Sequence, residues 1–203
     1  MKKYIFIGIL ILIVIAAFSS GLSKYNTMVS LDQEVEEAWA KVQVQYQRRL
    51  DLIPNMVETV KGYAAHESST LESVTNARAG LTDAYNKANE LKDAASPADP
   101  QAFNSYNEAQ QSLNRALSIY VNAVHEAYPD LKADTQFANL QTVLEGTENR
   151  IATERGRYTD VVKRFNVTVK QFPANIWASV FGFSARPQFE ADREAANAPQ
   201  VQF

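Results

Sequence analysis

The sequence lacks cysteine and contains little histidine, glycine or proline. Its 203 residues include no cysteine, two histidines, seven glycines and seven prolines. The absence of cysteine excludes a disulfide framework, a thiolate nucleophile and a cysteine metal site. The formal net charge of −3 is small, so the composition does not indicate nucleic-acid binding. Because Ala, Leu, Gln, Glu, Lys and Arg dominate the middle of the chain, the composition favours helix over sheet.

Sequence motifs for strands and for enzyme activity are also missing. The chain has no Asn-Gly turn, no sustained alternation of apolar and polar residues, and no G-x-S-x-G, P-loop or G-x-G-x-x-G motif. His66 and His125 lack the second histidine of a zinc-protease motif, and no carboxylate stands three residues before either of them, as a di-iron bundle requires. We therefore predict no enzyme activity and no cofactor. The alternative is a metal-dependent bundle enzyme that uses His66, Glu67 and Glu154.

One long hydrophobic run opens the chain. From Tyr4 to Leu22 about 19 residues carry no charge, which as a helix gives roughly 28 Å, enough to cross the hydrocarbon layer of a membrane. A cleaved signal peptide is the alternative, although Ala17 and Ser19 match its small-residue rule only loosely. We predict a transmembrane anchor over residues 1–23, because a helical pattern follows with no linker.

The lysines that flank this run predict its orientation. Lys2 and Lys3 precede it and Lys24 follows it. The positive-inside rule therefore places the N-terminus in the cytoplasm and the body of the chain on the other side of the membrane.

The body of the chain has apolar residues at spacings of three and four, which is typical of helices packed in a bundle. The stripes predict an all-α fold, an antiparallel four-helix bundle over residues 24–172 with helices at about 24–51, 54–93, 100–128 and 134–172. Asp99, followed by Pro100, predicts the start of the third helix, and Asp134 predicts the start of the fourth.

Pro54 allows two interpretations of the first two helices. The apolar stripe keeps its phase across Pro54, so one long kinked helix is possible, but a proline inside a helix costs about 3 kcal/mol. The alternative is a tight corner over residues 51–55. We predict the corner, because it gives four segments of similar length that can lie side by side.

The last part of the chain, residues 173–203 with Phe172 before them, is unusually aromatic. It carries large apolar side chains at Phe172, Ile176, Trp177, Val180, Phe181 and Phe183. An up-and-down bundle of four helices returns this segment to the membrane end. It either packs back over the end of the bundle or docks at the bilayer interface, and we predict a surface for the membrane or a partner.

Charged residues also occur at the edges of the apolar stripes. They are Arg49, Glu67, Arg78, Glu154 and Arg155. A long side chain can bury its stem and keep its charge in water, which requires no function. Alternatively, each charge has a buried partner of opposite sign, and such pairs set the register of the helices.

The ordered motifs of the chain resemble those of the LemA family. These are "YNTMVSLDQEVEEAWAKVQVQYQRRLDLIPNMVETVKGYAAHE", "LESVTNARA", "NLQTVLEGTENRIATERGRYTDVVKRFN" and the closing "FPANIWASVFGFSARPQFEA". The resemblance implies a bacterial, membrane-anchored four-helix bundle. It implies no established activity, no agreed ligand and no catalytic residue, and it suggests a setting in envelope maintenance or stress.

The sequence therefore predicts a non-enzymatic helical scaffold, anchored by a single span in the bacterial inner membrane. Its expected partners are the membrane and either a second copy or another envelope protein, with no nucleic acid and no small-molecule substrate. A bundle that binds a ligand or lipid in its cavity is the alternative function.

Overall fold

The computed structural model of the protein describes residues 2–64 and 72–189. The described part of the chain is helical and contains no strand. The helices are α1 (Lys2–Ala64), α2 (Glu72–Leu91), α3 (Pro100–Ala127), the short 3-10 helix η1 (Pro129–Ala133), α4 (Thr135–Lys170) and α5 (Ala174–Phe181). The prediction of an all-α bundle is confirmed.

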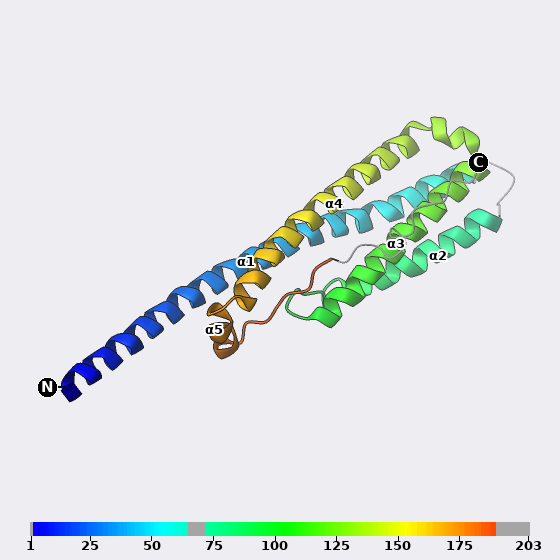
Figure 1. Ribbon diagram of the computed structural model, residues 1–203. Coiled ribbons are helices and arrows are strands. Elements are labelled where there is room, and N and C mark those ends of the chain that lie inside the picture. Colours follow the sequence, from blue (N-terminus) through cyan, green and yellow to red (C-terminus); the bar gives the residue numbers. More distant parts are fainter. Residues whose placement is uncertain (1, 65–71, 190–203) are drawn as a thin grey trace, which may run out of the picture.

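The four long helices alternate in direction along a common axis (Figure 1). Most contacts between long helices join α1 to α4 and α2 to α3, so the bundle is built from two helix pairs. The N-terminal part of α1 extends beyond the other helices, and α5 lies beside α1 where the bundle begins (Figure 1).

The start of each of the last two long helices follows the predicted capping chemistry. The Asp99 carboxylate accepts hydrogen bonds from the backbone N–H groups of Gln101 and Ala102 at 2.9 and 3.2 Å. The Asp134 carboxylate accepts two at 2.9 Å, from Gln136 and Phe137. Each cap satisfies donors that the first helical turn leaves unpaired.

The predicted corner at Pro54 is wrong. α1 runs through Pro54 without a break, so residues 24–51 and 54–93 do not form two separate helices. Pro54 is exposed, while Leu50, Ile53 and Met56 on the facing side are at most 3% exposed. Burial of three large side chains, worth about 1.5–3 kcal/mol each, outweighs the cost of the proline. The end of α1 falls at Ala64, and α2 begins at Glu72.

Replacing Pro54 with alanine is expected to stabilise the protein by about 1–3 kcal/mol, because it restores a backbone N–H and removes the clash of the ring with the preceding turn. The midpoint of unfolding in urea measures the gain. Asn55→Ala, on the same exposed turn, is the control and should change the midpoint much less. A loss of stability in Pro54→Ala would show that the proline sets a bend that the packing needs.

The apolar core divides into two clusters along the bundle axis. The cluster nearer the anchor contains the aromatic side chains of Trp39, Phe103, Tyr158 and Phe165, and the other is mainly aliphatic. The Trp39 indole N–H donates to the Ala95 carbonyl at 3.2 Å, which ties the loop between α2 and α3 to α1.

Candidate functional site

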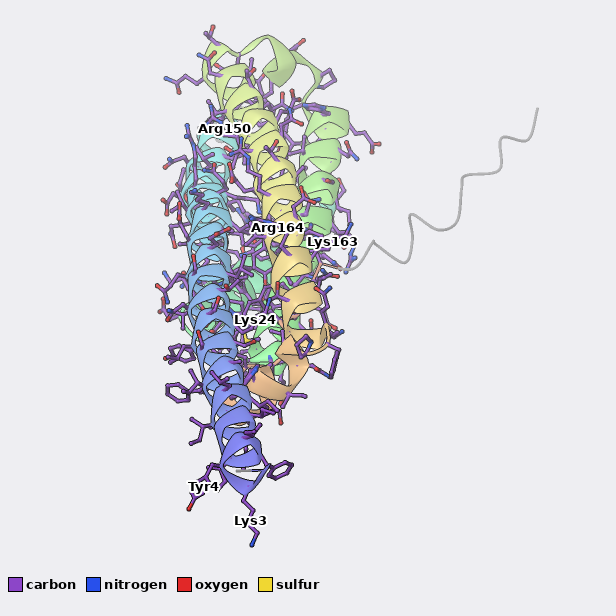
Figure 2. The ribbon with its side chains drawn as sticks, turned by 60° about the vertical axis from the view of Figure 1, so that its left-hand side comes forward. Lys3, Tyr4, Lys24, Arg150, Lys163 and Arg164 are labelled. Carbon is purple, nitrogen blue, oxygen red and sulfur yellow. The ribbon has the colours of Figure 1, made fainter. Side chains whose placement is uncertain are left out.

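The candidate membrane anchor is the first part of α1. Within the described residues, α1 alone is long and apolar enough to cross a membrane. Its apolar side chains between Tyr4 and Leu22 are exposed on all sides, as lipid contact requires. Figure 2 shows Lys3 and Tyr4 at the tip of α1, and Lys24 at the level where α4 and α5 join it. The chain thus has a candidate membrane anchor continuous with its bundle.

α5 packs against α1 directly after this anchor, as the bundle topology predicts. A Cβ atom added to Gly21 would lie only 2.8 Å from the Trp177 ring, so glycine allows the indole to reach the α1 backbone. The Tyr25 and Phe181 rings meet edge to face at 4.9 Å. The buried side chain of Ala178 is small, which also permits a close approach.

The opposite side of this segment is apolar and exposed. Phe172 is 76% exposed, Ile176 52% and Val180 66%; Ile176 and Val180 stand four residues apart on α5, and Phe172 precedes its cap residue Pro173. We call these three residues the α5 surface. The predicted interface residues therefore divide into two sets. Trp177, Phe181 and Phe183 contact α1 or α4, whereas the α5 surface faces away from them.

After α5, residues 183–189 form an extended strap along the bundle, which the sequence analysis did not foresee. Gly182 begins it with a φ of 78°, a conformation that favours glycine. The Arg186 guanidinium donates to the Asp32 carboxylate of α1 at 2.7 and 3.0 Å. The Asn166 side chain of α4 exchanges two hydrogen bonds, of 2.8 and 2.9 Å, with the Arg186 backbone. The strap thus joins α1 and α4.

Phe189 ends the strap in an aromatic slot. Its ring centre lies 5.1 Å from that of Phe103 and 5.2 Å from that of Tyr158. The Arg155 guanidinium lies 4.3 Å from the Phe189 ring centre. Arg155 was predicted to be a register-setting charge, and the structure places it against this aromatic ring. A polar Asn166 in mid-helix and the run "RPQF" after a glycine were the available sequence signals for the strap.

Arg186→Ala is expected to loosen the strap and to lower the free energy of unfolding by about 1–2 kcal/mol, because the ion pair with Asp32 is only 14–20% exposed. Hydrogen exchange of the backbone over residues 183–189 measures the loosening. Arg157→Ala removes an ion pair whose arginine is 65% exposed and should leave the exchange unchanged. Equal exchange in both variants would contradict a fastening role for Arg186.

The centre of the bundle contains a buried polar cluster around Arg49. The Arg49 side chain is 3% exposed and donates to both Glu148 carboxylate oxygens at 2.9 and 3.1 Å. It also donates to the backbone carbonyl of Gln110 at 3.1 Å and to the Gln110 side-chain oxygen. Arg49 therefore links α1 to α3 and α4. A partner for Arg49 was one of the two predicted alternatives, but Glu148 was not identified.

Within the described chain, the other charged residues at the edges of the apolar stripes do not make a buried link between three helices as Arg49 does. Glu154 pairs with the exposed Arg157 at 2.7 Å, one turn away on α4. Arg78 is half-buried on α2. Its positive charge partly opposes the rise that burial causes in the pKa of Tyr120. Glu67 lies outside the described residues, as does His66. A register-setting role for these charges stays a prediction.

The residues required for a metal site are not gathered within the described chain. No three His, Cys, Asp or Glu side chains in residues 2–64 and 72–189 lie close enough to hold an ion. The His125 ring pairs with the Gln141 amide at 2.9 Å and meets the Phe137 ring edge to face.

Four of the tyrosines buried in the bundle core have a raised pKa, namely Tyr46, Tyr106, Tyr120 and Tyr158. Burial raises the pKa of Tyr106 and of Tyr120 to about 12 and also raises the pKa of the other two. The low-dielectric core disfavours the charged phenolate, so the folded state holds these protons more tightly than the unfolded chain.

The protein is therefore expected to lose stability as the pH rises from about 10, the pKa of a tyrosine in the unfolded chain, through about 12. Because the folded pKa is the higher one, the contribution is fully present below pH 10 and disappears above it. Urea unfolding at a series of alkaline pH values measures the loss. Tyr106→Phe should reduce the slope, whereas a slope identical to wild type would contradict this origin.

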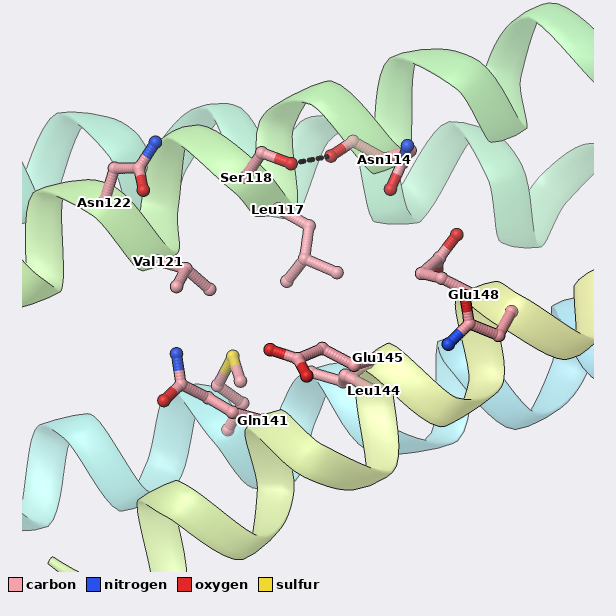
Figure 3. Close-up of a pocket in the computed structure, with 11 residues that line it drawn as sticks. Asn114, Leu117, Ser118, Val121, Asn122, Gln141, Leu144, Glu145 and Glu148 are labelled. Atoms are coloured by element: carbon pink, nitrogen blue, oxygen red, sulfur yellow. Dashed lines mark hydrogen bonds between the residues drawn. The ribbon is translucent and has the colours of Figure 1, made fainter. Parts of the chain in front are cut away.

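A groove of about 620 Å³ lies between α3 and α4. Leu117, Val121 and Leu144 supply apolar side chains, and Asn114, Asn122, Gln141 and Glu145 are among the polar side chains around it (Figure 3). The Ser118 hydroxyl donates a hydrogen bond to the backbone carbonyl of Asn114 (Figure 3). The groove has the mixed lining of a ligand site.

Comparison with known proteins gives the family. The LemA family model matches residues 38–203, a span that includes most of the bundle, α5 and the strap. The chain belongs to the LemA family. Protein LemA of Metamycoplasma hominis is 25% identical over 174 residues, covering 86% of this chain and 72% of that protein.

Two further relatives of this LemA-family chain carry a different name. Magnetosome protein MamQ 2 of Paramagnetospirillum magneticum is 25% identical over 202 residues, covering 94% of this chain and 73% of that protein. Magnetosome protein MamQ of Magnetospirillum gryphiswaldense is 23% identical over 206 residues, covering 96% and 75%. Both alignments extend over nearly the whole of this LemA-family chain.

Proposed function

We propose that this LemA-family protein is a non-enzymatic scaffold of the bacterial inner membrane that holds its bundle upright on the membrane surface. A single span anchors it, with the N-terminus in the cytoplasm and the bundle on the outer side. The α5 surface touches the bilayer, and the bundle associates with a second copy or with another envelope protein.

The position of the α5 surface carries this proposal. Apolar side chains of α1 cover roughly 28 Å before Leu22, which matches the hydrocarbon thickness. α5 contacts α1 at Gly21 and Tyr25, so it lies at the level where α1 leaves the hydrocarbon. Exposed Phe, Ile and Val side chains at that level are favourable in lipid and unfavourable in water. A second attachment of this kind restrains the tilt of the bundle.

The relatives and the interior of the bundle support a structural role. Two of the relatives are named as proteins of the magnetosome and none of the three reported carries an enzyme name. Among the buried polar residues of the described core, Arg49 bonds to Gln110 of α3, and it also bonds to Glu148 of α4. That arrangement fixes the order and register of helices, which a scaffold requires.

Labelling of a single engineered cysteine tests the orientation. The chain has no cysteine of its own, so Thr153→Cys, exposed on α4, provides a unique thiol. A membrane-impermeant maleimide should label it in spheroplasts, in which the outer face of the inner membrane is accessible, as completely as in permeabilised cells. Labelling only after permeabilisation would place the bundle in the cytoplasm and overturn the proposed orientation.

Mass measurement tests the association. Native mass spectrometry of the gently solubilised protein should show multiples of the 22.7 kDa chain or a stable complex with another envelope protein. A bare monomer, together with no cross-linked partner in intact cells, would contradict the scaffold role.

A ligand-binding bundle is the second candidate function, and the groove between α3 and α4 is the observation that favours it. Its volume lies within the usual range for small-molecule sites, roughly 300–1,000 Å³. A small molecule that co-purifies with the protein and is lost in Leu117→Trp, which fills the groove, would favour this function over a purely structural one.

A further inference from the structure

A small cavity lies beside the Arg49–Glu148 pair, in the middle of the bundle. Its volume is about 80 Å³, and side chains from α1, α3 and α4 surround it. Its charged and polar lining includes Tyr46, Arg49, Gln110, Arg115, Glu148 and Arg155. Three of these are arginines and one is a glutamate, so the lining carries an excess of positive charge.

Three buried donors in this lining have no partner within the described chain. The two terminal nitrogens of Arg49 bind Glu148 and Gln110, but its Nε–H has no acceptor. The Tyr46 hydroxyl and the side-chain amide nitrogen of Gln110 also lack a partner. Arg49 is 2% exposed and Tyr46 is 1% exposed, so bulk water does not reach either residue freely. Buried polar groups are nearly always hydrogen-bonded, and three unsatisfied donors in one cavity indicate an acceptor there.

The positive charge in the cavity is also only partly neutralised. Glu148 offsets Arg49. Arg155 stacks over the Phe189 ring, and Arg115 donates to the Ser112 hydroxyl at 3.3 Å. Neither Arg115 nor Arg155 has an ion-pair partner within residues 2–64 and 72–189, although both line the cavity. Clustered arginines favour an oxyanion, because guanidinium groups match its geometry and charge.

We propose that this cavity binds one small oxyanion, a carboxylate or phosphate group. The Arg49 Nε–H, the Tyr46 hydroxyl and the Arg155 guanidinium supply its hydrogen bonds. The volume corresponds to about two or three water molecules, which leaves room inside the cavity for one such group.

The oxyanion is either a free ion or the head of a short amphiphile. Asn114 and Glu148 line both the cavity and the groove between α3 and α4, so the two spaces adjoin. An aliphatic chain attached to the oxyanion would lie against Leu117 and Leu144 in the groove. The two sources share the same head-group chemistry and differ only in whether the groove is filled.

Thermal unfolding of the full chain in lipid nanodiscs tests the site, with inorganic phosphate, acetate or hexanoate added at constant ionic strength. Each bound ligand should raise the unfolding midpoint in a saturable way. Arg155→Gln should weaken the apparent affinity roughly tenfold, because it removes a charged hydrogen-bond donor. Arg150→Gln is the matched control, since Arg150 is exposed on the same helix and does not line the cavity (Figure 2).

Tyr46→Phe is a second variant, which separates the affinity for the anion from the stability of the protein without ligand. Removing a buried hydroxyl that has no protein partner should leave that protein as stable or more stable, while the affinity for the anion falls. Equal responses to acetate and hexanoate identify a free oxyanion, and a stronger response to hexanoate identifies an amphiphile; both support the site. The absence of any saturable shift, or equal shifts in all the variants, overturns it.

Discussion

Replacing Glu148 with alanine is expected to lower the free energy of unfolding by about 3 kcal/mol. The variant leaves the Arg49 guanidinium, 3% exposed, with only Gln110 as a partner. An uncompensated charge in a low-dielectric core is expensive because the folded chain cannot replace the water that the charge loses. Glu148 itself is 32% exposed, so some water reaches the gap, and we expect the lower end of the usual 3–5 kcal/mol range.

Two further variants separate the loss of the pair from the loss of any surface charge. Lys41→Gln breaks an ion pair whose side chains are 56% and 69% exposed and should change the stability far less than Glu148→Ala does. Arg49→Met combined with Glu148→Leu removes both buried charges and should recover most of the loss. Urea unfolding at neutral pH measures all three. If Glu148→Ala resembled Lys41→Gln, the pair would contribute no more than a surface contact.

The pair also explains why a stable core contains an arginine at all. Arg49 contacts α3 and α4 from α1, and its bonds require those three helices to be in one register. An aliphatic side chain at the same place would pack in several registers. We therefore expect Arg49→Met/Glu148→Leu to remain folded but to give broader amide resonances along α4 than wild type, because the register is less well specified.

Local patterns in the sequence predicted the elements of this fold. Side-chain spacing predicted helices over residues 100–128 and 134–172, close to the bounds of α3 and α4, and Asp99 and Asp134 cap these helices as expected. The topology of the bundle predicted that Trp177 would lie beside the anchor, and its ring packs on Gly21. Each of these features depends on residues close together in the chain or on the simple alternation of helix directions.

Features that depend on distant pairing were not predictable. Arg49 and Glu148 are 99 residues apart, and no local pattern indicates which carboxylate meets which arginine. The strap has no periodicity, so its anchoring by Asn166 and Asp32 appears only in three dimensions. At Pro54 a correct local rule gave a wrong result, because the rule states the cost of proline but not the burial of Leu50 and Met56 that exceeds it.

The second large effect is expected at the α5 surface. Replacing Phe172, Ile176 and Val180 together with serine should weaken the contact between α5 and the membrane by about 3–5 kcal/mol. Each apolar side chain contributes about 1.5–3 kcal/mol when it is fully buried, and these three insert only partly. Because the α1 anchor keeps the chain on the vesicle, the result is α5 leaving the lipid rather than the protein dissociating. The quantity to measure is therefore the environment of α5 itself.

Tryptophan fluorescence in vesicles with brominated acyl chains measures that environment. The chain has two tryptophans, and Trp39 is 3% exposed in the bundle core, so quenching by lipid reports on Trp177. Wild-type fluorescence should be partly quenched, and the triple serine variant should lose most of that quenching. Val44→Ser with Ile119→Ser is the control, because these exposed apolar residues lie on the body of α1 and α3.

The control also separates bilayer contact from general surface hydrophobicity. Val44 and Ile119 are 62% and 61% exposed, close to the exposure of Ile176 and Val180. Val44 lies roughly 33 Å beyond Leu22 along α1 at 1.5 Å per residue, and Ile119 stands on α3 between Leu117 and Tyr120 of the core cluster farther from the anchor. If only position relative to the membrane matters, the control retains wild-type quenching. Quenching that persists in the triple serine variant would mean that Trp177 reaches lipid without the α5 surface. The α5 surface would then not be what keeps α5 in the lipid.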